Sequence, residues 1–128
     1  MNRTPKSIPS DVQAATQSLA ASMSSAEPFV GYWRAERTLN EDRPAQQLLH
    51  DLAAAQAEVR RRQYDNRLSE EELRHLRSLQ EAVQSSSSIS EHTAAQQRVI
   101  ALVREVNQEI SQLLGIDFGS LAKRAGCC

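Results

Sequence analysis

The chain has 128 residues, of which 40% are hydrophobic and only 4% aromatic, and its 15 Lys plus Arg residues are balanced by 16 Asp plus Glu residues. A formal net charge of −1 leaves no overall field that would draw the protein onto nucleic acid or an anionic membrane. Residues 45–114 contain neither Gly nor Pro, which excludes a β-sandwich or β-barrel, since those folds need such residues in turns every ~8–12 positions. No apolar run approaches the ~18 residues of a membrane-spanning helix. These features predict an all-α protein without membrane insertion. The only two cysteines are adjacent, too few and too close for a disulfide framework, which favours a reducing cytoplasm.

The first part of the chain predicts a tail followed by two short helices. Residues 1–9 carry two prolines among polar side chains and are expected to form a flexible N-terminal tail. Ser10 begins a Ser-x-x-Gln capping box for a weakly apolar helix over residues 11–24. Pro28 suits the first turn of a second helix over residues 28–41. That helix carries three of the five aromatic residues, namely Phe29, Tyr32 and Trp33.

Two further helices are expected in the region without Gly or Pro. The third covers residues 44–63 and ends at the turn Tyr64–Arg67, because Asp and Asn tolerate left-handed backbone. Ser69 and Glu72 form a capping box for the fourth helix, which reaches residue 84. Apolar residues recur every three or four positions on both helices, at Leu48, Leu52, Val59, Leu73 and Leu76.

The last long helix has the clearest pattern in the chain. The serine run Ser85–Ser88 is predicted to be a connector, because serine side chains compete with the helix for backbone groups. Ser88 and Glu91 have capping-box spacing for the start of the helix, and Gly115 ends it, with Ile116 in a Schellman-like cap. The apolar seam repeats at heptad-like 4-3-4-3 spacing, at Val99, Val103, Val106, Ile110 and Leu113.

The connector lengths predict how these helices are arranged. Links of about four to six residues force consecutive helices to lie antiparallel, so the third to fifth helices should form an up-down-up unit. We expect one domain over residues 10–116, an antiparallel hairpin or bundle of about five helices, followed by a tail over residues 117–128 with at most a short helical turn after Asp117. Narrow stripes and few aromatics leave a small core, which predicts a homo-oligomer, either a dimer or a tetramer.

Few residues suggest chemistry beyond binding. Cys127 and Cys128 are the only cysteines, and thiolates from two chains could supply the four sulfurs of an iron–sulfur cluster or zinc site. The alternative is a free, reducible tail. Arg60, Arg61 and Arg62 form the only dense basic cluster and could contact RNA phosphates, although acidic neighbours favour a solvated helix end. No motif supports catalysis, and no other cofactor is expected.

The order of these signals resembles the YlbF/YmcA family of bacterial regulators of competence, biofilm formation and sporulation. The resemblance covers about residues 10–118 and lies in EPFVGYWRA (27–35), in Leu39 followed by DRPAQQL (42–48), in LSEEEL (68–73) and in VREVNQEIS (103–111). It implies an all-helical, self-associating protein without catalytic activity. For some members it also implies a complex that adjusts the endoribonuclease RNase Y and so mRNA processing.

The resemblance also bears on the terminal cysteines and on the function. In some members of the family a cysteine-rich C-terminal tail is linked to iron–sulfur clusters, and Cys127 and Cys128 correspond to it in position only. The favoured function is a non-catalytic adaptor that binds itself and a partner such as an RNA-processing protein. The alternatives are a prefoldin-like chaperone or coiled-coil scaffold, and a redox or iron–sulfur sensor that works through the two cysteines.

Overall fold

The computed structural model describes residues 8–126 of the chain, and within that range it contains α-helices and no strand. The all-α prediction is confirmed. None of the helices in this range is long and apolar enough to cross a membrane. The helices are α1 (Ser10–Ser25), α2 (Glu27–Glu41), α3 (Arg43–Tyr64), α4 (Glu70–Ser85), α5 (Ser87–Leu114) and α6 (Phe118–Gly126).

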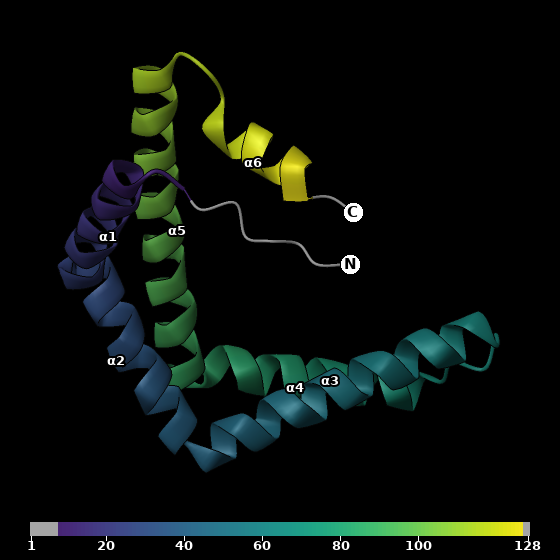
Figure 1. The fold of residues 1–128 in the computed structure, drawn as a ribbon. Helices are drawn as coiled ribbons and strands as arrows, with labels where there is room; N and C mark the ends of the chain where they lie inside the picture. Colours follow the sequence, from purple (N-terminus) through teal and green to yellow (C-terminus); the bar gives the residue numbers. More distant parts are fainter. Residues whose placement is uncertain (1–7, 127–128) are drawn as a thin grey trace, which may run out of the picture.

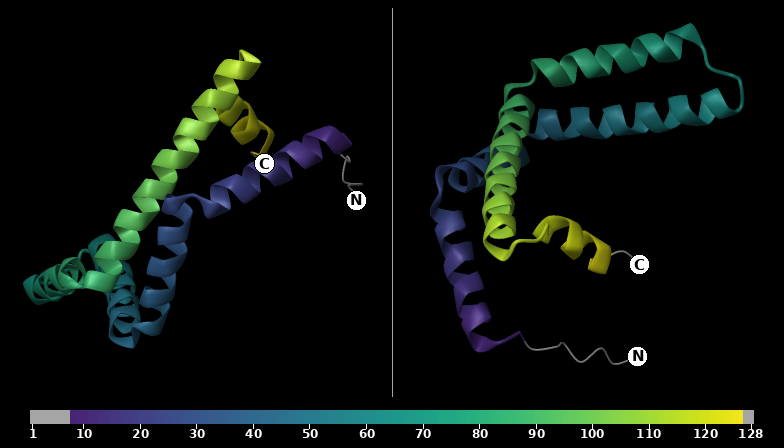
Figure 2. Two further views of the ribbon diagram at one scale, coloured as in Figure 1. Left: turned by 90° about the vertical axis from the view of Figure 1, so that its left-hand side faces the viewer. Right: turned by 90° about the horizontal axis from the view of Figure 1, so that it is seen from above.

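The helices form two arms that meet at a corner (Figure 1). The hairpin arm consists of α3 and α4, which run antiparallel as the sequence predicts. The long arm consists of α2 and α5, the helix pair with the most extensive contact in the molecule. Helix α1 precedes α2 and extends outward from its first turn, while α6 folds back against α5 (Figure 2). Both terminal helices therefore extend from the long arm.

The corner contains the small hydrophobic core. Leu39, Ala45 and Ile89 are buried there, and they come from α2, α3 and α5 respectively. Leu48 and Leu49 of α3 and Val83 of α4 pack against them. A cluster of this size joins the two arms but leaves most of each arm outside it.

Most predicted helix ends are confirmed. Ser69 Oγ accepts the Glu72 backbone N–H at 3.2 Å, and Glu72 Oε2 accepts the Ser69 N–H at 3.1 Å, which completes the capping box. Asn66 adopts the left-handed conformation expected of the turn, with φ 58°. Gly115 has φ 71°, and the Ile116 N–H donates to the Ser111 carbonyl at 3.2 Å, as in a Schellman cap.

Replacing Ser69 with alanine is expected to lower the free energy of unfolding by about 1 kcal/mol, because the first turn of α4 loses its side-chain acceptor. Urea denaturation followed by circular dichroism measures the change. Ser78 is exposed in the interior of α4, so Ser78→Ala is the matched control. It should leave stability unchanged or raise it slightly, because alanine has the higher helix propensity. Equal losses in the two variants would show that the cap does not contribute.

Two predicted caps are wrong. Helix α1 begins at Ser10 itself, so its hydroxyl does not occupy the N-cap position, and the Gln13 N–H donates to the Pro9 carbonyl instead. The capping box predicted from Ser88 and Glu91 is also absent, because Ser88 already lies inside α5. Only one residue of the serine run, Ser86, lies outside the helices, so the predicted connector is shorter than expected.

The predicted up-down-up arrangement is correct for α3 and α4 and wrong for α5. Ser86 has extended backbone, with φ −78° and ψ 118°, and this single residue turns the chain away from the hairpin arm. Helix α5 then packs along α2, as Figures 1 and 2 show. The small side chains of Ala35 and Ala95, both buried, allow these two helices to lie close together.

The segment after Gly115 is more helical than the expected short turn. Asp117 Oδ1 accepts the Ser120 N–H at 3.2 Å and its Oδ2 accepts the Ser120 hydroxyl at 2.7 Å. These bonds stabilise the first turn of α6, which extends to Gly126. They also hold the pKa of Asp117 below its usual range, with the Ser120 hydroxyl the largest cause.

Candidate protein-interaction site

An aromatic cluster on the long arm is the best-defined candidate for binding. Tyr32 and Trp33 meet edge to face, with ring centroids 5.3 Å apart and planes at 70°. The ring centroid of Tyr32 also lies 5.3 Å from that of His92 on α5. Trp33 is 54% exposed, whereas Tyr32 and Phe29 are half-buried. The cluster therefore presents an indole to solvent on a support fixed by two helices.

The predicted apolar stripes lie in different environments. Those of the hairpin arm are half-buried, as expected for side chains that hold α3 against α4: Leu48, Leu52, Val59, Leu73 and Leu76. On α5, Val99, Val106 and Ile110 are half-buried, but Val103 is exposed and Leu113 is 82% exposed. Their role in binding a partner stays a prediction.

The face of α5 that packs inside the chain differs slightly from the predicted seam. Ala95 is buried and Leu102 is half-buried, whereas Val103 is exposed. Sequence spacing could not show this, because Leu102 and Val103 fit a heptad pattern equally well. The choice depends on where α2 lies. Val103 is thus left available at the surface.

A polar contact that the sequence does not predict joins the two arms. Asp42 Oδ1 accepts the Ala45 N–H at 3.1 Å and caps α3, while its Oδ2 accepts the Ser88 hydroxyl of α5 at 2.7 Å. These bonds, Ser88 first and Ala45 second, hold the pKa of Asp42 below its usual range. Ser88 is only 4% exposed. The Asp before Arg43-Pro44 is a recognisable N-cap signal, but nothing local identifies Ser88 as its partner.

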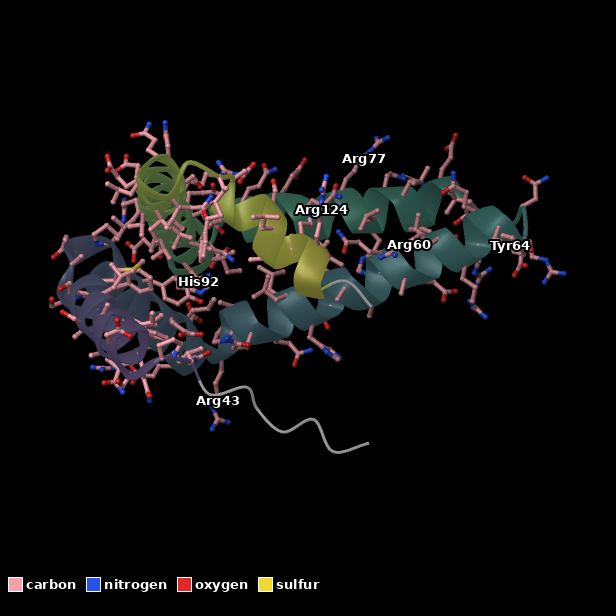
Figure 3. The ribbon with its side chains drawn as sticks, turned by 45° about the horizontal axis from the view of Figure 1, so that its top comes forward. Arg43, Arg60, Tyr64, Arg77, His92 and Arg124 are labelled. Atoms are coloured by element: carbon pink, nitrogen blue, oxygen red, sulfur yellow. The ribbon has the colours of Figure 1, made fainter. Side chains whose placement is uncertain are left out.

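The three arginines near the tip of the hairpin arm are not equivalent. Arg61 Nη2 and Arg62 Nε donate to Glu58 Oε1 at 2.7 and 2.9 Å, and Arg62 Nε lies 3.2 Å from Glu72 Oε1 on α4. Arg60 is exposed. Tyr64 lies at the tip itself and is almost fully exposed (Figure 3). Because two of the arginines already contact carboxylates, the structure does not gather them into one basic patch, and RNA contact stays a prediction.

Acidic pH is expected to weaken the ion pairs that Glu58 makes near the tip of the hairpin arm. The hydrogen bonds from Arg61 and then Arg62 lower the pKa of Glu58 from 4.5 to about 2. Because the folded value is the lower one, the stabilisation from Glu58 is fully present above pH 4.5 and is lost as the pH falls toward 2. Glu58→Gln should therefore be less stable than the unmutated protein at pH 6, and the gap should narrow toward pH 2.5. Urea denaturation at both pH values measures it, and a constant gap would contradict the assignment.

In the described part of the chain, no groove brings together enough ligands to bind a metal ion. One groove on the hairpin arm, of 340 Å³, brings Glu58, Glu72 and His75 to the same side of α3 and α4. Among the described residues, no three His, Cys, Asp or Glu side chains are placed to hold a metal ion. The predicted cluster ligands Cys127 and Cys128 lie outside the described residues.

Comparison with known proteins identifies the family. The model of the family described as "Control of competence regulator ComK, YlbF/YmcA" matches residues 12–114, which run from α1 to the end of α5. The chain belongs to the YlbF/YmcA family. The resemblance seen in the sequence is thereby confirmed, and the YlbF/YmcA family is a regulatory one. The matched region includes both arms and the corner, whereas α6 lies after its end.

A solved structure confirms the fold expected of a YlbF/YmcA protein. The chain is similar to Bacillus subtilis RicA in the crystal structure of RicA in complex with RicF, with a TM-score of 0.73 and 18% sequence identity. The similarity covers 82% of this chain and 94% of that one. A search of curated protein sequences finds no relative.

Proposed function

We propose that this YlbF/YmcA protein is a cytoplasmic, non-catalytic regulatory adaptor that acts by presenting helix faces to itself and to a protein partner. Membership of a regulatory family supports the regulatory role. The complex of the structurally similar RicA with RicF supports binding to another protein. We further propose that the partner acts in RNase Y-type mRNA processing, and that competence, biofilm formation or sporulation responds through it.

The observation that carries this proposal is the exposed indole of Trp33, which packs on a pair of rings from α2 and α5. Tryptophan is enriched among the residues that contribute most to protein interfaces, because it combines a large apolar area with few rotatable bonds. Here the ring packs edge to face on Tyr32, which is itself held against His92 of α5. A partner that covers Trp33 would thus gain apolar burial without first having to order the side chain.

Affinity capture from the source bacterium tests the proposal. The tagged chain should recover a protein of RNase Y-type mRNA processing, and Trp33→Ala should reduce the recovered amount at least 10-fold. Tyr64→Ala is the matched control, because it also removes an exposed ring but from the tip of the other arm. It should leave the capture unchanged. Recovery of no RNA-processing protein, or equal losses in the two variants, would contradict the proposal.

A further inference from the structure

The chain crosses the corner twice, and each crossing uses a single non-helical residue. Only Asp42 lies between α2 and α3, and only Ser86 lies between α4 and α5. Asp42 has φ −88° and ψ 86°, while Ser86 has φ −78° and ψ 118°. Because φ and ψ are the only soft backbone angles, these two residues set the direction in which the next helix leaves the corner.

On either side of the corner the helices are held in pairs. Helix α2 packs along α5, and α3 packs along α4, which are the two most extensive helix contacts in the molecule. By contrast, α2 meets α3, and α4 meets α5, near the corner where the arms join (Figure 1). Each arm is thus one body that is joined to the other through Asp42 and Ser86. Two bodies joined at two points turn about the line through those points, so the corner has the geometry of a hinge.

Side-chain hydrogen bonds restrain this hinge. Asp42 Oδ2 accepts the Ser88 hydroxyl at 2.7 Å, and Ser88 follows Ser86 by two residues, so the bond ties the two crossings together. Gln46 Nε2 of α3 donates to the Leu39 carbonyl of α2 at 3.1 Å, across the first crossing. The bond to the carboxylate is of the stronger, charge-assisted kind. Because Ser88 is buried, water does not readily replace this bond, which makes it the main polar restraint on the angle between the arms.

The apolar contacts at the corner limit the rotation without fixing its angle. Leu39 and Ile89 on the long arm meet Ala45 on the hairpin arm, and all three are buried. The apolar side chains packed against them, Leu48, Leu49 and Val83, are only half-buried. Fully packed interiors resist deformation, whereas half-buried side chains have room to follow a change in angle. The core therefore keeps the arms together, while the Asp42–Ser88 bond selects the angle.

We propose that the corner is a hinge about which the two arms turn as rigid bodies, and that the Asp42–Ser88 hydrogen bond holds it at the angle seen here. The hinge sets the distance between Trp33 on the long arm and Tyr64 at the tip of the hairpin arm. A partner that contacts both arms binds best at one hinge angle and shifts the population toward it. The proposal concerns the motion of this chain alone and does not rest on the proposed adaptor function.

Distances between spin labels test the proposal on the full chain. One label at Gln63→Cys on the hairpin arm and one at Gln97→Cys on the long arm report the angle, since both sites are exposed. Cys127→Ser and Cys128→Ser remove the native thiols. The labelled chain is diluted with an excess of unlabelled chain, so that only distances within one chain are measured. Pulsed double electron–electron resonance on frozen samples then gives the distribution of distances.

Ser88→Ala should broaden this distribution at least ~1.5-fold relative to the chain with Ser88, because the bond that holds the angle is lost and further angles become populated. Ser90→Ala is the matched control, since Ser90 is exposed two residues further along α5, and it should leave the width unchanged. A second label pair, at the exposed Gln63 and Gln80 within the hairpin arm, should keep the same width in both variants. That result would show that the arm turns as one body.

Several results would overturn the proposal. Equal widths with Ser88 and with Ser88→Ala would show that the bond does not hold the angle, as would equal broadening by Ser90→Ala. Broadening of the label pair within the hairpin arm would show that the arm unfolds and does not turn. If circular dichroism shows that Ser88→Ala fails to fold, Ser86→Gly replaces it, because glycine frees the backbone of the second crossing and leaves Asp42 and Ser88 in place. Ser86→Gly should also broaden the distribution, and an unchanged width would contradict the hinge.

Discussion

Ile89→Ala is expected to lower the free energy of unfolding by about 2–4 kcal/mol, one of the two largest effects predicted for this chain. Ile89 is buried at the corner with Leu39 and Ala45, where few other apolar side chains are available to fill the space. The loss includes the transfer free energy of the removed methyl groups and the cost of the cavity left behind. Since small domains are stable by only about 5–15 kcal/mol, the change should be large relative to the total.

Urea denaturation at a low protein concentration measures this effect. Ile89→Val should cost less, about 0.5–1.5 kcal/mol, because one methylene is removed. Ile8→Ala makes the same chemical change at an exposed site before α1 and should alter stability by less than about 0.5 kcal/mol. If Ile89→Ala behaved like Ile8→Ala, the corner would not be the core that joins the arms.

The helices could be predicted from the sequence, whereas the packing around Ile89 could not. The helices themselves follow from local signals, namely the Ser69 cap, Pro28 and Pro44 in first turns, and Gly115 at the end of α5. These signals act within four or five residues, so they can be recognised without knowing the fold. The antiparallel hairpin of α3 and α4 follows in the same way from its short turn.

The direction of α5 could not be predicted in this way. A connector of any short length predicts an antiparallel neighbour, but Ser86 directs α5 to α2 instead of α4. The partner is decided by contacts between residues far apart in sequence, including the Asp42–Ser88 hydrogen bond across 46 positions. The serine run predicts the interruption between α4 and α5, but the shortness of the connector and the burial of Ser88 depend on this long-range contact.

In the candidate site, too, the local features could be predicted from the sequence and the packing could not. That Phe29, Tyr32 and Trp33 occupy one short helix is evident from the sequence. Which ring is exposed depends on α5, because His92 covers Tyr32 and leaves Trp33 outside. Likewise, the exposure of nearly all of α1 follows from the packing, in which α2 and not α1 lies along α5. A helical pattern identifies an apolar face, but only the packing shows whether that face is already used.

Ala95→Leu is expected to lower the free energy of unfolding by about 1–3 kcal/mol, because a larger side chain is forced between α2 and α5. Ala95 is only 2% exposed, and Ala35 of α2 is buried on the same arm. Separating the helices would also disturb the contact of Tyr32 with His92. The variant should therefore lose part of the partner capture that depends on Trp33.

Ala101→Leu makes the same substitution on the exposed side of α5 and provides the control for this effect. Leucine and alanine differ little in helix propensity, so the control should change stability by less than about 0.5 kcal/mol and leave the capture intact. Equal stability of the two variants in urea would show that the close approach of α2 and α5 does not hold the long arm together. A loss of stability at Ala95 without a loss of capture would instead separate the fold of the arm from its role in presenting Trp33.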